Sequence, residues 1–469
     1  MTVSPRRARR TTVAVLTAAA TCGALALTTP AVSAAPAAVT SSSGSIGGAA
    51  WAAKVPAAWN GTVLLFNHGI RTTLDPNRAA ELAPTGSDGD AASSLLDRGY
   101  ALLGSSYRSN GFAVRDAVND DIALLASFKA SHPGKVKRTY VWGASLGGLI
   151  TETLAEEQPG LVSGAAPACG VLVGAVPIAD QVLDTLVMTR TFFAPTLKVA
   201  GYASNAEALQ VFTSLKATVL KQLSDPATQT ASVGKILAIA TLQGLPYQTH
   251  SFNGTATSSQ VGAATEGVLT QAGAAILGSR DSIARTGGNY ATDVGTLYLN
   301  RVNSQTVARF ASVGLGASLL RSYALTLDRR VLRLPANPIA RQRARLLGAP
   351  TGLVKVPTVT MHTEFDQFVT AANEQLFAAR VAAKGAGGRV LQAWIKPPAY
   401  ADLTATAGGA PYGAGHCNFT VSQWDGLVDT LGAFVTSGAK PDPAPIFTAA
   451  GAPGLDPAFS PLTWTGTKA

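Results

Sequence analysis

Hydrophobic and polar positions alternate along this chain with two different periods. Short apolar runs, typical of buried strands, occur at 51–55, 62–67, 100–105, 139–142, 161–166, 356–362 and 389–395. Apolar residues spaced three and four apart predict helices that include 114–131, 146–157, 371–384 and 422–436. Strands that alternate with helices favour a mostly parallel sheet with helices on both faces.

The middle of the chain shows only the helical period. Its expected helices are 178–193, 206–223, 233–242, 261–284 and 304–334, the last with a break near Gly314–Gly316. We interpret 170–347 as a large helical cap inserted between the sixth and seventh core strands, with the sheet domain at 49–169 and 348–440. We expect 35–48 to be a flexible leader and the Pro-rich tail, 441–469, to lack regular structure.

The first 34 residues predict an export signal. Four arginines precede an apolar run, Val13–Leu27, which is too short for a membrane span and is followed by small residues typical of a cleavage site. We therefore expect a secreted, extracellular protein, cleaved near Ala34. Twin-arginine export and a lipoprotein anchor at Cys22 fit less well. Thr11 and Thr12 directly follow the arginines, where twin-arginine signals have bulky apolar residues, and no leucine-type residue lies three before the cysteine.

Charge and composition narrow the choice of partner. Without the four arginines of the signal, 33 basic residues face 27 acidic ones, a net charge near +6. Because no basic repeat or aromatic-basic interleaving occurs, we expect no nucleic-acid partner. Metal-ligand spacings and phosphate loops are also lacking, so we expect no metal and no cofactor. Cys169 and Cys417 form either one disulfide or two buried thiols.

A serine within a glycine-rich turn is the candidate nucleophile. The run Thr139–Trp142 breaks into Gly143-Ala144-Ser145-Leu146-Gly147 and continues into helix formers. Small residues two before and two after a serine permit the sharp strand-to-helix turn that exposes its hydroxyl. The helix start leaves N–H groups free, so we expect the N–H of Leu146 to form half of an oxyanion hole. A similar pattern at 316–320 shows that this motif needs support from residues elsewhere.

A serine nucleophile needs a histidine base and a carboxylate that orients this base. In hydrolases with a doubly wound sheet, the acid and then the histidine follow the serine in the chain. Asp366 follows the apolar run 356–362, with Glu364 as the alternative acid. Only His416 lies beyond them, in a glycine-rich loop before the last helix. We predict Ser145, Asp366 and His416 as the catalytic residues.

These motifs resemble those of the α/β-hydrolase superfamily, and within it secreted bacterial serine esterases, over most of the chain after the signal. The matching pieces are His68–Ile70, Gly143–Gly147, His362–Asp366 and Gly415–His416. The resemblance implies the α/β-hydrolase fold, in which Ser145 attacks an acyl carbon, His416 transfers the proton and Asp366 orients His416. It also implies the backbone N–H of Ile70 as the second oxyanion donor. Thr363 departs from the glycine that often follows the strand histidine.

The resemblance also bears on the two cysteines. In secreted feruloyl esterases and tannases, a cysteine beside the histidine is bridged to one beside the serine. Cys417 adjoins His416, but Ala144 precedes Ser145, so that pattern is broken. Cys169 follows the strand that neighbours the strand of the serine, and we expect it to reach the same sheet edge. This favours a disulfide between Cys169 and Cys417.

We expect a serine hydrolase that cleaves a small or polymeric carboxylic ester through an acyl-enzyme. A peptidase or amidase with the same triad is the alternative, although the predicted cap has few acids to anchor a free amine. A hydrolase fold that only binds a ligand is a further alternative. Arginines near the end of the cap indicate either a charged solvent face or capture of an anionic substrate group. They are Arg329, Arg330, Arg333, Arg341, Arg343 and Arg345.

Overall fold

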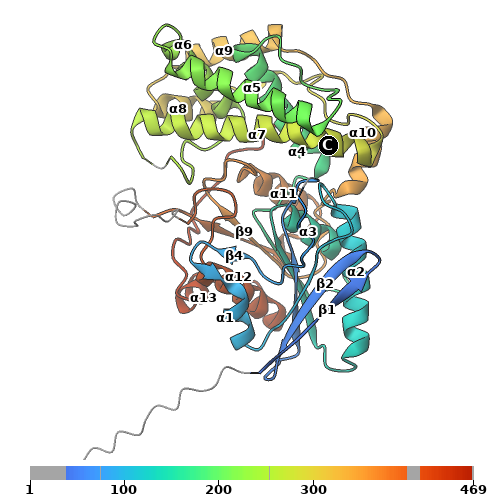
Figure 1. Ribbon diagram of the computed structural model, residues 1–469. Coiled ribbons are helices and arrows are strands. Elements are labelled where there is room, and N and C mark those ends of the chain that lie inside the picture. The colour runs from blue at the N-terminus through green and yellow to red at the C-terminus, as the bar shows by residue number, and fades with distance from the viewer. Residues whose placement is uncertain (1–37, 74, 253, 399–411, 467–469) are drawn as a thin grey trace, which may run out of the picture. The chain divides into compact units, whose positions relative to one another are not determined.

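An eight-stranded sheet organises the chain (Figure 1), which we describe from a computed structural model over residues 38–466 except 74, 253 and 399–411. The predicted signal peptide, 1–34, lies outside the described residues. The strands, in spatial order, are β1 (Val39–Ile46), β2 (Ala49–Pro56), β6 (Ala101–Ser105), β3 (Thr62–Asn67), β7 (Arg138–Ala144), β8 (Gly164–Ala168), β9 (Thr358–Thr363) and β10 (Val390–Ile395). β2 pairs antiparallel with β1 and β6, and the other pairs are parallel. A separate short ribbon consists of β4 (Thr85–Gly86) and β5 (Gly89–Asp90).

Helices cover both faces of the sheet. They are α1 (Ala91–Asp97), α2 (Val114–Ser131), α3 (Leu146–Glu157), α11 (Ala372–Ala383), α12 (Val421–Ser437) and α13 (Pro443–Ala449), with the short 3-10 helix η3 (Gly387–Arg389). Side chains of a strand point alternately to the two faces. On β3, Val63 and Leu65 therefore pack with α2 and α3, whereas Leu64 and Phe66 pack with α1 and α12. This strand order with helices on both faces is the α/β-hydrolase fold.

A run of helices separates β8 from β9 in the chain, and we call it the helical insertion. Its members are α4 (Ala175–Phe193), α5 (Asn205–Ser224), α6 (Gln229–Leu242), α7 (Thr257–Thr286), η1 (Tyr298–Arg301), α8 (Ser304–Ser312), α9 (Ala317–Arg330), α10 (Pro338–Ala344) and η2 (Arg345–Leu347). All of them except α10 and η2 share a hydrophobic core that includes Leu186, Ile236, Val268 and Phe310. The predicted break at 314–316 separates α8 from α9. The division into domains stays a prediction.

Helix length and composition also bear on membrane crossing. Over the described residues, no single helix is both long and apolar enough to cross a bilayer. Only the pair α8 and α9, bent by 116° at its break, meets those criteria when the two helices are joined.

Two expectations about the ends of the chain were wrong. Residues 39–46, expected in a flexible leader, form the edge strand β1, because backbone hydrogen bonds to β2 need no hydrophobic alternation. Its side chains are mostly exposed, so this segment lacks the alternation of apolar and polar residues from which a half-buried strand is predicted. The tail beyond 440 contains α13, which begins with Asp442 as N-cap and proline in the first turn, and buries Phe447.

Candidate active site

Ser145 occupies a sharp turn between β7 and α3. It is the single residue between the end of the strand and the start of the helix, and its backbone has φ 61° and ψ −122°. Positive φ is costly for a residue with a side chain, so the surrounding structure must hold this turn. Here the N–H of Ser145 donates to the carbonyl of Ala168 at 3.0 Å, which ties the turn to the end of β8.

Two glycines make this turn possible. A Cβ on Gly143 would lie 2.6 Å from the Cβ and carbonyl oxygen of Asn67, and a Cβ on Gly147 would overlap the same carbonyl. The strand β3 and the start of α3 therefore approach each other more closely than any side chain permits. The spacing of the motif thus has a steric cause in the neighbouring strand.

The structure brings together the three predicted catalytic residues. In the sequence, Asp366 follows Ser145 by 221 positions and His416 follows Asp366 by 50. The Nε2 atom of His416 is 2.7 Å from Oγ of Ser145, and its Nδ1 atom is 2.7 Å from Oδ2 of Asp366. An ionised carboxylate can only accept, so Nδ1–H donates to Asp366, and Nε2 is left to accept the hydroxyl proton of Ser145. This arrangement can deprotonate the serine as it attacks.

Fixed donors hold the carboxylate of Asp366. Its Oδ1 atom accepts the backbone N–H groups of Phe368 and Val369 at 2.8 and 2.9 Å. Burial alone would raise the pKa of Asp366, but the charge of His416 and hydrogen bonds from His362 and His416 keep it well below its usual range. Asp366 therefore stays ionised at neutral pH.

The alternative acid, Glu364, lies in different surroundings. Its backbone N–H donates to Ile395 on β10, and its side chain lies near Asp456 and Lys396. Burial and the charge of Asp456 raise the pKa of Glu364 to about 7. His416 is bonded to Asp366, so the geometry favours Asp366 in the orienting role.

A second buried histidine, His362, lies behind this acid. Its Nε2 atom is 2.8 Å from the carbonyl oxygen of Val369 and 3.5 Å from Oδ2 of Asp366, and its Nδ1 atom is 3.3 Å from Oε1 of Glu374. Burial alone would lower the pKa of His362, but its hydrogen bonds to Asp366 and Glu374 raise it to about 10. Since both ring nitrogens face acceptors, we infer an imidazolium that supports the ionised Asp366.

The contact between His362 and Glu374 was not predicted from the sequence. No spacing signal links the two, because Glu374 comes from α11 and meets the histidine only through packing against β9. Thr363, the departure from the expected glycine, donates from Oγ1 to the carbonyl of Gly415 at 2.9 Å. This hydrogen bond holds the His416 loop against the end of β9.

The two backbone N–H groups predicted as oxyanion donors belong to segments near the serine. Leu146 is the first residue of α3, so its N–H has no intrahelical partner. A Cβ on Gly69 would lie 3.4 Å from the Cβ of Ser145, so the segment before Ile70 passes directly beside the serine. His68 is buried and stacks on Tyr107 with ring centroids 4.1 Å apart. The oxyanion role of Leu146 and Ile70 stays a prediction.

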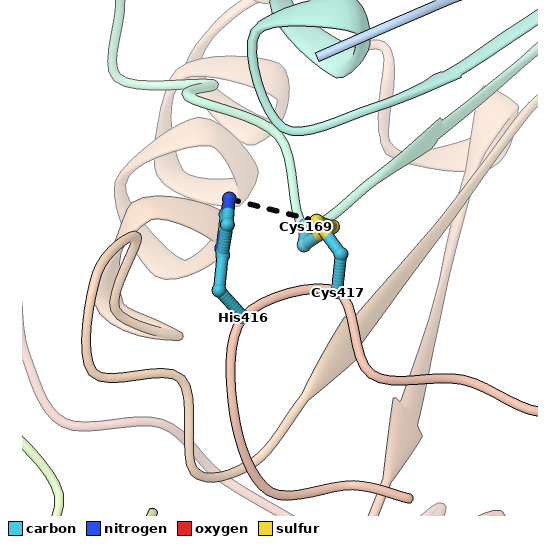
Figure 2. A group of neighbouring side chains, drawn as sticks. All are labelled: Cys169, His416 and Cys417. Atoms are coloured by element: carbon cyan, nitrogen blue, oxygen red, sulfur yellow. Dashed lines mark hydrogen bonds between the residues drawn. A yellow bond between two sulfur atoms is a disulfide. The ribbon is translucent and has the colours of Figure 1, made fainter. Parts of the chain in front are cut away.

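A disulfide joins Cys169 to Cys417 beside His416 (Figure 2). Cys169 directly follows β8, Cys417 follows His416, and their Cα atoms are 5.5 Å apart. Both cysteines have positive φ, 42° and 54°. The two sulfur atoms and His416 are close enough to suggest a metal site. Sulfur bound in a disulfide is not a thiolate, however, and is a poor metal ligand, so His416 is left as the one good ligand of this group.

A cavity of about 370 Å³ opens beside Ser145. Ile70 and Leu146 lie in its wall with the serine, and most of the remaining wall comes from the helical insertion. The cavity thus brings the predicted oxyanion donors and the insertion to one place.

A family model matches this sequence over residues 44–280 and is described as a tannase-like family of unknown function (DUF6351). The match covers 237 of the 469 residues. The chain belongs to this tannase-like family. Membership in the family and the α/β-hydrolase fold together support a hydrolase function. No curated protein matches the chain at a significant level.

Several solved structures are similar to this member of the tannase-like family. Feruloyl esterase B from Aspergillus oryzae is 13% identical, with a TM-score of 0.37. The match covers 84% of this chain and 78% of the esterase. The acylaminoacyl peptidase from Pyrococcus horikoshii is 12% identical over 88% of this chain, with a TM-score of 0.37. The match spans 44% of the length of that peptidase.

Proposed function

We propose that this protein is a secreted serine hydrolase that cleaves carboxylic esters through an acyl-enzyme intermediate. The main support is the pair of hydrogen bonds that joins Ser145 to His416 and His416 to Asp366, each 2.7 Å long. A nucleophile, a base and an ionised orienting acid in this geometry are suited to acyl transfer. The tannase-like family and the disulfide are compatible with an extracellular protein.

In the proposed reaction, Oγ of Ser145 attacks the carbonyl carbon of the ester while Nε2 of His416 accepts its proton. The backbone N–H groups of Leu146 and Ile70 stabilise the oxyanion that forms. His416 then protonates the departing alcohol, and a water molecule hydrolyses the acyl-enzyme by the same route. Asp366 keeps its charge throughout and stabilises the imidazolium of His416.

Esters are favoured over peptides with a free N-terminus because of the charges near Ser145. Asp281 is the one carboxylate among the described residues that line the cavity. Its oxygens accept the N–H of Phe112 at 2.7 Å and the Nε–H of Arg285 at 2.9 Å. This acid is therefore already neutralised and is a poor anchor for a substrate ammonium group.

The proposal is tested by hydrolysis of p-nitrophenyl acetate by the purified protein and its Ser145→Ala variant. We expect turnover by the wild type and a loss of at least about 10³-fold in kcat for the variant, because the nucleophile is gone. A fluorophosphonate probe should label the wild type and leave the alanine variant unlabelled.

Ser318→Ala is a matched control, since Ser318 is an exposed residue of α9 within the similar motif at 316–320. It should hydrolyse the ester and take up the probe as the wild type does. Equal ester hydrolysis by the wild type and Ser145→Ala would reject the assignment of the nucleophile. If the wild type neither hydrolyses the ester nor reacts with the probe, the hydrolase proposal is rejected in favour of a protein that only binds a ligand.

A further inference from the structure

We propose that the acid part of the substrate is an uncharged aliphatic chain of medium length, bound in the cavity beside Ser145. This inference rests on the proposed function and adds to it the chemical class of the acyl group. Four features of the cavity carry it: its position relative to the base, the side chains in its wall, the space left by small residues, and its charges.

The position of the cavity assigns it to the acyl group. His416 has to protonate the departing alcohol, so the alcohol must lie next to Nε2 of His416. Ser145, Leu146 and Ile70 line the cavity, whereas His416 does not. The cavity therefore adjoins the nucleophile and the predicted oxyanion donors, and His416 contacts its wall through Ser145 and through Phe368, with ring centroids of His416 and Phe368 5.2 Å apart.

Aliphatic side chains form much of the wall. Leu146 and Val369 contribute from the sheet domain, and Val171 contributes from the segment between β8 and α4. Ile178, Leu183 and Val199 contribute from the helical insertion. All six are buried. An apolar chain placed here leaves water on binding and gains contacts, whereas a hydroxylated ring would need a hydrogen-bond partner for each hydroxyl. In the described wall, Ser279 is the residue whose buried hydroxyl lacks a partner.

Small residues on α7 leave room for the chain. Ala274, Ala275 and Gly278 face the cavity, and a Cβ added to Gly278 would meet no atom within 4 Å. The volume of about 370 Å³ is at the lower end of the range for small-molecule sites. The site therefore suits one chain of limited length.

Charged acyl groups do not fit this environment. Asp281 is neutralised by Arg285, as described above, and it is the one charged side chain among the described residues of the wall. None of the arginines considered for anion capture is among the described residues of the wall. Arg341 pairs with Asp180 at 2.8 Å and Arg333 pairs with Asp293 at 3.4 Å. A carboxylate or ammonium on the acid part would be buried without a counter-ion.

The experiment compares p-nitrophenyl esters of increasing acyl length, a p-nitrophenyl monoester of a dicarboxylic acid, and a trihydroxybenzoate ester. In the wild type, kcat/KM should rise by about fourfold for each methylene added to acetate, and should fall once the chain exceeds about ten carbons. The charged ester and the trihydroxybenzoate ester should react at least about tenfold more slowly than the best alkyl ester.

Gly278→Leu tests whether the chain occupies this cavity. The added side chain should lower the ratio of kcat/KM for octanoate over acetate by at least about tenfold. Gly160→Leu is the control, because Gly160 is exposed in the turn after α3 and its added Cβ also meets no atom within 4 Å. It should leave the chain-length profile unchanged.

Different failures can be told apart. If Ser145 reacts with the fluorophosphonate probe but the charged or hydroxylated ester is preferred, the aliphatic inference is overturned and the proposed function stands. An unchanged octanoate-to-acetate ratio in Gly278→Leu also overturns it. If Ser145 neither reacts with the probe nor turns over any ester, both proposals fall.

Discussion

At the scale of single residues, the site depends on which carboxylate faces the base. Asp366 and Glu364 are two positions apart and follow the same strand, so their sequence context is almost shared. Their surroundings differ in what they offer a negative charge. Asp366 has two backbone donors and two histidines, whereas Glu364 lies near Asp456. The first environment keeps a carboxylate ionised, and the second favours its protonated form.

Conservative amides at these two positions should behave in opposite ways. Asp366→Asn should lower kcat for p-nitrophenyl acetate by about 10⁴-fold, because an amide that donates to Nδ1 selects the wrong tautomer of His416. Glu364→Gln resembles the protonated acid and should keep kcat within about twofold of wild type. Melting temperatures of both variants serve as folding controls. Loss of activity in Glu364→Gln with activity kept in Asp366→Asn would show that the acid is misassigned.

At the scale of elements, the proposed base, His416, lies on a loop that several contacts hold in place. The disulfide joins this loop to the end of β8, Thr363 bonds the carbonyl of Gly415 from the end of β9, and Asp366 bonds His416 itself. Cys169 is in turn anchored by its N–H to the carbonyl of Met361 at 2.7 Å. Adjacent parallel strands thus place the loop over the serine, and the disulfide limits its movement.

Removing this disulfide should affect both stability and catalysis. The free energy of unfolding of the double variant Cys169→Ser, Cys417→Ser should be about 2–5 kcal/mol lower than that of the wild type, since the disulfide closes a long loop in the unfolded chain. Its kcat should fall by about tenfold or more, because a small displacement of His416 weakens proton transfer. Urea unfolding and ester hydrolysis measure the two effects. Dithiothreitol should change the wild type but not the double variant, and a double variant with wild-type kcat would contradict the positioning role.

At the scale of the whole molecule, the buried imidazolium of His362 couples folding to pH. Its pKa is about 10 in the folded chain, against an ordinary value of 6.5. The protonated form therefore stabilises the fold fully below about pH 6.5, and this stabilisation is lost progressively as the pH rises to about 10. Glu364, whose raised pKa is about 7, changes stability in the same direction but within a more acidic range.

The free energy of unfolding should consequently fall between pH 7 and pH 10 in the wild type. His362→Gln should be less stable by about 3–5 kcal/mol at pH 7, because it leaves Asp366 and Glu374 as buried carboxylates without their cation. Its deficit should shrink toward pH 10, where the wild type also loses this charge. Urea unfolding at several pH values, repeated in the Glu364→Gln background, provides the test. Parallel pH curves for wild type and variant would exclude His362 as the titrating group.

Local sequence determined the elements and the order of the candidate residues. The predicted bounds of α2 and α3 agree with the structure, because hydrophobic periodicity and the stop signals around them are properties of adjacent residues. The glycine spacing predicted the turn at Ser145 for the same reason. The order of serine, acid and histidine narrowed the candidates to Asp366 or Glu364 with His416.

Tertiary structure decided what depends on residues distant in the chain. Strand β1 exists through its pairing with β2, and the choice of Asp366 over Glu364 follows from which carboxylate meets His416. The pairing of His362 with Glu374 arises where α11 packs on β9, and the cavity arises where the helical insertion meets the turn at Ser145. Periodicity records which face of an element is buried. It does not record which other element packs on that face. That packing determines which charged groups meet inside the fold and how large the cavity beside Ser145 is.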